Sequence, residues 1–198
     1  NDNSTYSVPN VNGPRLFNNV CSTVHPNGGA MFASINIDNG SQTFLKATSA
    51  GWTSPAGTLG VAADNETGHY CAIAFDADGV GYYAGAYDNR TGLALFTSTD
   101  NFSSVTNIGG NEFSDPSGNL NALELAIDPT SKMPIVAASF GTVGEMWMYD
   151  NVSGDWAQLG PNVTVTATSM IGLAVVDTDT FVMSTSADNA TITVFYDN

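Results

Sequence analysis

Residues that could act as acids, bases or nucleophiles are scarce in this sequence. It holds two histidines, His25 and His69, and neither stands in the His-Glu-x-x-His pattern of zinc hydrolases. No serine or cysteine lies in a Gly-x-Ser-x-Gly turn that would expose a nucleophile. Arg15 and Arg90 are too few for a cluster that would hold a substrate's carboxylate. We therefore predict no catalytic residues.

Glycoside hydrolysis is the reaction that carboxylates alone could support. It needs two carboxylates across a cleft, typically ~5–9.5 Å apart. The glutamates are Glu66, Glu112, Glu124 and Glu145, and their spacing singles out no pair. Glu124 is the best candidate acid because it lies on a strand expected to face a central channel. An acid beside a solvated channel needs no catalytic role, so a glycoside hydrolase is only the third functional hypothesis.

Two acidic turns could bind a cation. Asp76-Ala77-Asp78-Gly79 and Asp177-Thr178-Asp179 each offer two carboxylates. A complete calcium loop would continue with further oxygen ligands and a glutamate, and neither turn does. Asx turns explain both segments more simply, so we expect no cofactor and keep structural Ca²⁺ as the less favoured alternative.

Aromatic residues offer a different chemistry, the binding of a sugar ring. The aromatic candidates for such a platform are Trp52, Trp147, Trp156, Tyr82, Tyr83 and Tyr149. Aromatic residues at repeating strand positions more often pack structural units together. A carbohydrate-binding lectin is therefore the second functional hypothesis.

The composition favours β-structure and excludes several partners. The chain has 198 residues, 42% of them hydrophobic, and a formal net charge of −15. Nucleic acids and anionic membranes both require clustered Lys and Arg, and only four such residues are present. No segment shows sustained helical periodicity or an apolar run long enough to span a membrane. The remaining polarity comes from Asn, Ser, Thr and Gly, which suits strands and turns.

An internal repeat of about 50 residues organises the chain. Four apolar runs each end in a polar turn that begins at His25, Asp76, Asp128 or Asp177, and these positions are 51, 52 and 49 apart. A second landmark, an apolar residue followed by glycine, recurs at Gly60, Gly109 and Gly160, spaced 49 and 51. Trp52 and Trp156 fall at matching places in the first and third units. Two landmarks with one period predict tandem structural units.

Each unit contains four short strands separated by turn residues. The third is the clearest, with LELAID, PIVAASF, EMWMYD and DWAQLG. Over essentially the whole chain this pattern resembles the blade repeats of β-propellers, although no single family's motif is matched. The resemblance implies an all-β, four-bladed propeller-like domain over 15–198, with repeats near 15–60, 69–109, 120–160 and 169–198.

One turn is similar to a motif of sialidase-type propellers. The segment STDNFSSV, from Ser98 to Val105, resembles an Asp-box (S-x-D-x-G-x-T-W) but lacks its glycine and tryptophan. No functional residue is transferred from this resemblance.

The fourth unit is expected to have only three strands. Its ending, FYDN, matches MYDN of the third unit, after which the fourth strand of that unit begins. An N-terminal arm over 1–14 carries a candidate replacement, since Gly13 lies 47 positions before Gly60. We predict that this strand covers the open edge of the last unit, in cis or in a neighbouring copy. The donor residues would be Thr5, Tyr6, Ser7, Val8, Pro9, Asn10, Val11, Asn12 and Gly13.

Sequons and cysteines indicate a secreted protein. Cys21 and Cys71 could form a disulfide, and the chain, which does not begin with Met, reads as a processed form. Asn-x-Ser/Thr motifs recur at expected turns, where Asp-Asn hairpin chemistry is the alternative explanation. We expect N-glycans at Asn3, Asn39, Asn65, Asn89, Asn101, Asn151, Asn162 and Asn189.

These features together favour a non-catalytic structural glycoprotein. An open unit with a matching arm, dense sequons and low charge suggest a self-assembling subunit of an extracellular fibre, sheath or surface layer. Its main partner would be further copies of the same chain.

Overall fold

The computed structural model describes residues 17–36, 42–48, 51–53, 58–59, 70–87, 92–108, 113–114, 119–165, 170–177, 180–188 and 191–197. Every regular element among these residues is a β-strand, which confirms the predicted all-β class. In this part of the chain no helix is long and apolar enough to cross a membrane.

The first two sheets are antiparallel and each has a short fifth strand. The first has the order β1-β2-β3-β4, with β5 also on β3: β1 (Phe17–Val24), β2 (Ala30–Asn36), β3 (Gln42–Thr48), β4 (Gly51–Thr53) and β5 (Thr58–Leu59). The second has the order β6-β7-β8-β10, with β9 also on β8: β6 (Cys71–Phe75), β7 (Gly81–Tyr87), β8 (Gly92–Ser98), β9 (Thr106–Asn107) and β10 (Phe113–Ser114).

The third sheet repeats this pattern, and the fourth is smaller. The third has the order β11-β12-β13-β14, with β15 also on β13: β11 (Leu120–Ile127), β12 (Pro134–Phe140), β13 (Val143–Asp150), β14 (Asp155–Gln158) and β15 (Val163–Thr164). Three strands form the fourth: β16 (Met170–Asp177), β17 (Thr180–Asp188) and β18 (Thr191–Asp197).

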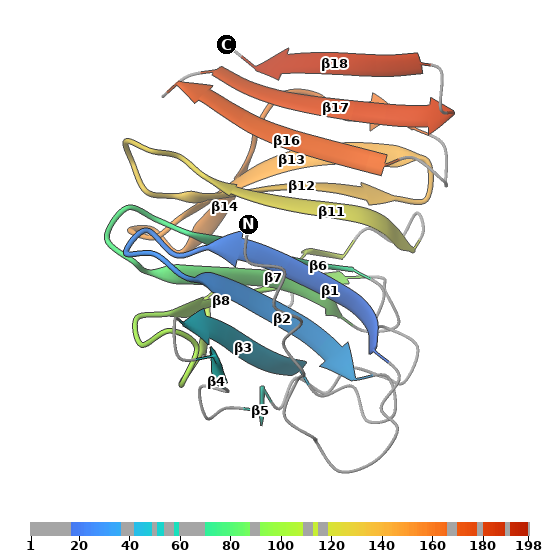
Figure 1. Ribbon diagram of the computed structural model, residues 1–198. Coiled ribbons are helices and arrows are strands. Elements are labelled where there is room, and N and C mark those ends of the chain that lie inside the picture. Colours follow the sequence, from blue (N-terminus) through green and yellow to red (C-terminus); the bar gives the residue numbers. More distant parts are fainter. Residues whose placement is uncertain are drawn as a thin grey trace.

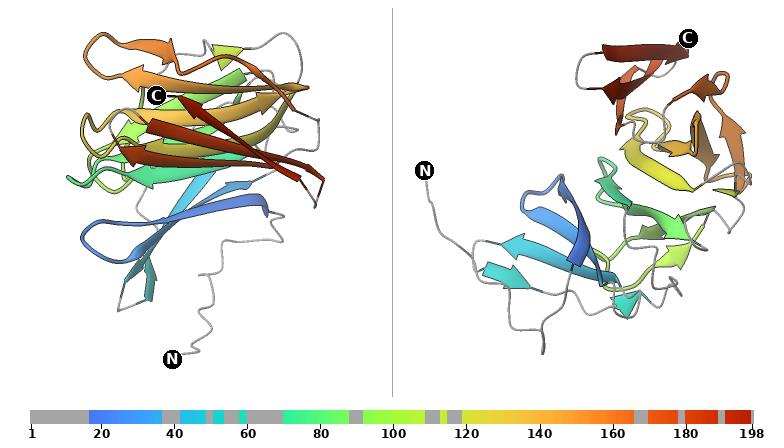
Figure 2. Two further views of the ribbon diagram at one scale, coloured as in Figure 1. Left: turned by 90° about the horizontal axis from the view of Figure 1, so that it is seen from above. Right: turned by 90° about the vertical axis from the view of Figure 1, so that its right-hand side faces the viewer.

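The sheets are stacked along an arc (Figures 1 and 2). The inner strand of each sheet packs against the inner strand of the next, in the sequence β1, β6, β11, β16. Among the described residues, β1 and β16 do not pack in this way, and the first and fourth sheets occupy the two ends of the arc. The described residues therefore form an arc of four sheets.

The hydrophobic core lies between the sheets. Phe44 of the first sheet packs with Tyr83 and Phe102 of the second, and Tyr82 of the second packs with Tyr149 of the third. A third cluster joins Met146 of the third sheet to Ile171 and Met183 of the fourth. Inner sheets thus bury both faces, and all seven residues of β12 are buried. This explains why PIVAASF is a continuous apolar run without polar alternation.

The repeat landmarks fit the structure in two of three units. Ile108 N–H donates to Leu95 O, and Leu159 N–H donates to Met146 O, so these landmarks are equivalent. Leu59 instead pairs with Gln42, the first residue of β3, so its pairing differs from that of the other two landmarks. The first unit has eight positions from Trp52 to its landmark glycine, whereas the third has four from Trp156. Leu59 therefore keeps the period of the landmark without its pairing.

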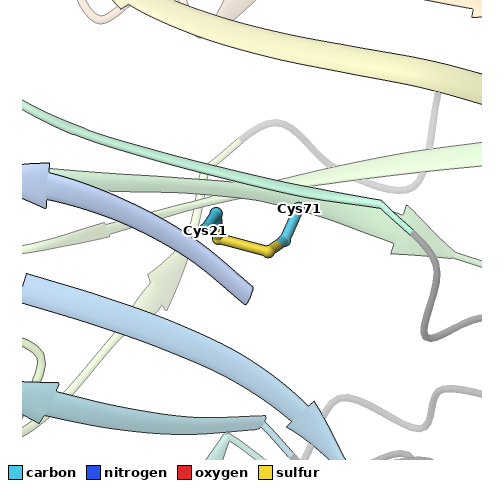
Figure 3. Close-up of a disulfide and its surroundings, with 2 residues drawn as sticks. All are labelled: Cys21 and Cys71. Carbon is cyan, nitrogen blue, oxygen red and sulfur yellow. A yellow bond between two sulfur atoms is a disulfide. The ribbon is translucent and has the colours of Figure 1, made fainter. Parts of the chain in front are cut away.

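A disulfide joins the first two sheets, as the sequence predicts. Cys21 on β1 and Cys71 on β6 are bonded, with Cα atoms 5.8 Å apart and 50 positions between them in sequence (Figure 3). The separation of one repeat places the two cysteines on adjacent inner strands. The bond therefore closes a loop that contains most of the first sheet.

We expect the double variant Cys21→Ser/Cys71→Ser to lose about 2–4 kcal/mol of unfolding free energy, because the unfolded chain is no longer constrained by that loop. Urea unfolding followed by tryptophan fluorescence measures this. The natural chain in reductant is the control and should match the variant. Equal stability of the oxidised chain and the variant would contradict the prediction.

Candidate functional site

The inner hairpin turns share one capping arrangement. Asp76 Oδ1 accepts hydrogen bonds from Asp78 N–H (2.9 Å) and Val80 N–H (2.8 Å). Asp128 Oδ1 accepts one from Thr130 N–H (3.0 Å), and His25 Nδ1 accepts one from Asn27 N–H (3.1 Å). All three capping side chains are buried. The first three turn-entry residues thus have one structural role, which explains their period, and the imidazole substitutes for a carboxylate.

The same turns connect neighbouring sheets. A Cβ on Gly79 would lie 3.3 Å from His25 Nε2, so the first two turns touch. Lys132 Nζ forms an ion pair with Asp78, which connects the second and third turns. Burial lowers the pKa of His25, and the charge of Lys46 lowers it further. His25 is therefore a neutral cap near neutral pH.

These contacts account for the acidic turn that was a candidate cation site. Asp76 caps its own hairpin, and Asp78 is paired with Lys132. Within the described ranges no group of three or more His, Cys, Asp or Glu is arranged to hold a metal ion. Asp177 ends β16, while Thr178 and Asp179 lie outside the described residues.

The turn that resembles an Asp-box is held together by hydrogen bonds to its aspartate, Asp100. Asp100 accepts from the Ser104 hydroxyl (2.6 Å), Ser104 N–H (2.9 Å) and the Ser98 hydroxyl (2.8 Å). These bonds, that of the Ser104 side chain above all, lower the pKa of Asp100 to about 2. The turn leads from β8 to β9, the third and fourth strands of its unit.

Phe102 occupies the glycine position of that motif in an unusual conformation. Its φ is +62°, a region that bulky residues seldom adopt. The Ser98 hydroxyl oxygen accepts the Phe102 N–H at 2.8 Å, and the ring stacks on Phe44 of the first sheet with centroids 4.4 Å apart. A Cβ on Gly81 would lie 2.6 Å from this ring, so that glycine makes room for it. The incomplete motif thus places the Phe102 ring between the second sheet and the first, where it packs the two together.

A row of polar and aromatic side chains lies on the outer strands of the third sheet. Cross-strand pairs join Tyr149 to Trp156 and Trp147 to Gln158, and Asn162 follows beside Glu145. Because strand side chains alternate, Glu145, Trp147 and Tyr149 share one face. We call the set the outer ladder; its members are Glu145, Trp147, Tyr149, Trp156, Gln158 and Asn162.

Hydrogen bonds fix the polar half of the outer ladder. Glu145 is buried, and its Oε2 accepts from Trp147 Nε1 at 3.1 Å while its Oε1 accepts from Asn162 Nδ2 at 3.0 Å. Gln158 Nε2 donates to Asn162 Oδ1. Gln158 and Asn162 are exposed, so this network reaches the surface.

The aromatic half of the outer ladder faces the second sheet. Tyr149 and Trp156 meet edge to face with centroids 5.2 Å apart, and Tyr149 packs in one cluster with Tyr82 of β7. Asn151 Nδ2 donates to the Tyr82 hydroxyl at 3.3 Å. Trp147 and Trp156 are only partly buried. The ladder thus runs from the core between two sheets to solvent.

Of the six aromatic candidates, the structure brings four together. Tyr82, Trp147, Tyr149 and Trp156 lie in or against one cluster, whereas Tyr83 belongs to the cluster between the first and second sheets. Trp52 lies on β4, and its side chain is outside the described part of the chain.

The sequence analysis did not predict the polar members of the outer ladder, Glu145, Gln158 and Asn162, as binding residues. The place of Glu145 beside Trp147 and Tyr149 was predictable, because a strand over EMWMYD puts every second residue on one face. Gln158 and Asn162 depend on pairing across strands, which local sequence does not specify.

Other sheets carry different residues at the equivalent positions. The shared hydrogen bonds of Ile108 and Leu159 make Ala94 and Phe96 the counterparts of Glu145 and Trp147 in the second sheet. In the first sheet, where Trp52 pairs with Ala47, the counterparts are Thr43 and Leu45. Within the three sheets compared, the carboxylate occurs in the third alone.

The two described candidate acids lie on opposite faces of the third sheet. Glu124 pairs with Ala137, and Glu145 pairs with Ala138, and consecutive strand residues point to opposite faces. Partial desolvation raises the pKa of Glu124, and no charged group of the described residues adds to this effect. The pair does not span a cleft as a glycosidase requires. Glu66, Glu112 and His69 lie outside the described residues.

Three sequon asparagines fall in described turns. Asn101 and Asn151 follow the third strands of their units, and Asn162 lies between β14 and β15. Asn151 and Asn162 are exposed, whereas Asn101 is half-buried and its Oδ1 accepts from Lys46 Nζ at 3.2 Å. Outside the described residues are Asn3, Asn39, Asn65, Asn89 and Asn189.

The fold is that of β-propellers, as comparison with solved structures shows. No protein-family model and no curated protein matches the chain. The lectin of Aleuria aurantia, solved with Fucα1-6GlcNAc, is similar over 92% of this chain and 65% of its own, at 12% identity and a TM-score of 0.58. The SapL1 lectin, solved with α-methyl fucoside, is similar over 91% and 63%, at 11% identity and a TM-score of 0.59.

A propeller hydrolase is similar as well. The GH93 α-L-arabinofuranosidase of Fusarium graminearum matches over 96% of this chain and 64% of its own, at 11% identity and a TM-score of 0.55. The chain therefore spans a little under two thirds of the length of each of these three proteins. At such identities the likeness concerns the fold, and the resemblance to propellers inferred from the repeat is confirmed at that level.

We expect Ser104→Ala to raise the pKa of Asp100 from about 2 toward its ordinary value of 3.8. A lowered carboxyl pKa stabilises the fold above pH 3.8 and this contribution is lost as pH falls through about 2, so the variant should unfold at a higher pH on acidification. Carboxyl ¹³C NMR titration measures the pKa. Thr99→Ala, in the same turn, is the control. An unchanged Asp100 pKa in Ser104→Ala would refute this assignment.

Proposed function

We propose that this protein is a non-catalytic carbohydrate-binding β-propeller protein and that the outer ladder is its binding site. The observation that carries the proposal is the continuous row from buried Glu145 to exposed Gln158 and Asn162, alongside two partly buried tryptophans. The lectin hypothesis is thereby preferred to the structural one for this surface.

The chemistry of the outer ladder suits a sugar. A pyranose ring has an apolar C–H face and an edge of hydroxyl groups. Aromatic faces such as those of Trp147 and Trp156 provide dispersion contacts to C–H groups. A side-chain amide both donates hydrogen bonds to hydroxyls and accepts them, a carboxylate accepts them, and Gln158 and Asn162 supply amides at the surface. The bonds of Glu145 to Trp147 and Asn162 hold these groups in place before a ligand arrives.

The charge of the protein limits the ligand class to neutral saccharides. The outer ladder contains a carboxylate and no Lys or Arg, and the whole chain has a formal net charge of −15. Sialic acid and sulfated sugars would be repelled by this field. Neutral hexoses and deoxyhexoses would not.

Solved structures with this fold support a saccharide as the ligand. Two of the similar structures are lectins solved with fucosides, and another is a hydrolase of arabinofuranosides. These three structures show that proteins with this fold can bind saccharides, while the residues of the outer ladder carry the assignment here.

A glycan array followed by calorimetry with the best ligand tests the site. Asn162 is both a ladder residue and a sequon, so the assay uses the Thr164→Ala chain, which removes the sequon and retains the amide. We expect Trp156→Ala and Gln158→Ala each to weaken binding at least ~10-fold. Trp52→Ala, at the equivalent position of the first sheet, should bind like its parent.

Absence of binding across neutral glycans would refute the proposal. Binding that Trp52→Ala abolishes and Trp156→Ala preserves would place the site elsewhere. Circular dichroism of each variant confirms that the fold is retained.

We also propose that the chain is secreted and carries covalent N-glycans. A disulfide and eight sequons, two of them at exposed described turns, support this. Treatment with a glycosidase that converts glycosylated Asn to Asp should mark Asn151 by a mass increase of about 1 Da, since the conversion replaces an amide by a carboxyl. Asn162 should keep its amide, which the outer ladder uses. Unmodified Asn151, in protein from its native source, would contradict the proposal.

The fibre, sheath or surface-layer subunit stays a second candidate function. The eight sequons and the low share of charged residues, 12%, favour it.

A further inference from the structure

Among the inner hairpin turns, the first has a different kind of cap from the second and third. Asp76 and Asp128 cap their turns with a carboxylate, whereas His25 caps the first turn with an imidazole nitrogen. An ordinary aspartate is ionised above about pH 4, so it still accepts hydrogen bonds in mild acid. An imidazole accepts one only while it is neutral, because the protonated ring carries a hydrogen on both nitrogens. The first turn therefore has a cap that mild acid can remove.

The imidazole of His25 also forms a contact between the first sheet and the second. Its ring meets the ring of Phe75, on β6, edge to face, with centroids 4.6 Å apart. Its Nε2 lies against the second turn, where a Cβ on Gly79 would be 3.3 Å away. The His25 side chain is buried in this position. One imidazole thus caps its own turn and packs against the turn of the next sheet.

The charged groups around this imidazole disfavour its protonation. Burial of the ring, and next the positive charge of Lys46 on β3, lower the pKa of His25. The carboxylates of the second turn are bonded to other groups, since Asp76 accepts the backbone N–H groups of its own turn and Asp78 pairs with Lys132. Among the described residues, no carboxylate accepts a hydrogen bond from the ring. A proton on this imidazole would therefore be a buried charge without a counter-charge bonded to it.

We propose that His25 is an acid-sensitive switch at the contact between the first and second inner turns. In the neutral state Nδ1 accepts the Asn27 N–H at 3.1 Å and the ring lies against Gly79. Once Nδ1 gains a proton, two N–H donors face each other, so the hydrogen bond is lost and the ring leaves the second turn. The disulfide between Cys21 and Cys71 holds β1 beside β6. Acid therefore opens the two turns and leaves the two strands together.

The switch makes the stability of the fold depend on pH in one direction. The pKa of His25 lies below its ordinary value of 6.5 in the folded chain, so the unfolded chain binds this proton first as the pH falls. The contribution of the neutral cap to the unfolding free energy is fully present above pH 6.5. It is lost progressively as the pH falls from 6.5 to the lower pKa of the folded chain.

An NMR titration tests the opening of the turns. We expect the His25 ring to titrate below pH 6.5, the Asn27 amide signal to move with it, and the Overhauser contact between the His25 and Phe75 rings to vanish once the ring is protonated. The Thr130 amide, which the Asp128 carboxylate caps, is the internal control and should not move over this range. A ring that titrates at 6.5 or above, or a ring contact that persists after protonation, would overturn the proposal.

Urea unfolding at about pH 7.5 and about pH 5, on either side of the ordinary histidine pKa, provides the second measurement. His25→Asp repeats the cap of the next two turns, and His25→Asn supplies an amide oxygen that accepts at every pH. Other titrating groups are common to all three chains, so the difference between them isolates His25. We expect the urea midpoint of the natural chain to fall toward pH 5 by more than that of either variant. A fall of equal size in the natural chain and in both variants would refute the switch.

Discussion

The burial of both faces of the inner sheets is the constraint on which this structure depends. A sheet that packs on two neighbours cannot alternate apolar and polar residues, and β12 accordingly reads PIVAASF with every residue buried. Each interface is then an aromatic or aliphatic cluster between two sheets. Three further contacts also join neighbouring sheets: the disulfide from β1 to β6, the ring of Phe102 on Phe44, and the ion pair of Asp78 with Lys132. The stack is therefore stabilised by contacts between its sheets.

The outer ladder follows from the same constraint. Toward the outer strands of the third sheet the interface approaches solvent, so apolar packing gives way to side chains with polar ends. Tyr149 remains in the core, Trp147 and Trp156 are half-buried, and Gln158 and Asn162 are exposed. Buried Glu145 is retained there because Trp147 and Asn162 satisfy both of its oxygens. The proposed saccharide site therefore lies at the margin of a packing surface.

Local patterns in the sequence were sufficient for the elements and for the repeat. The turn-entry residues recur because each buried cap must accept backbone N–H groups, and cysteines one repeat apart fall on neighbouring inner strands. Relations between strands were less accessible. Leu59 keeps the period although it pairs elsewhere on β3, because extra residues after Trp52 shift the register. The left-handed backbone conformation of Phe102 was not predictable either, because the ring of Phe44, on another sheet, stabilises it. The arc, set by contacts between distant residues, was the hardest to foresee.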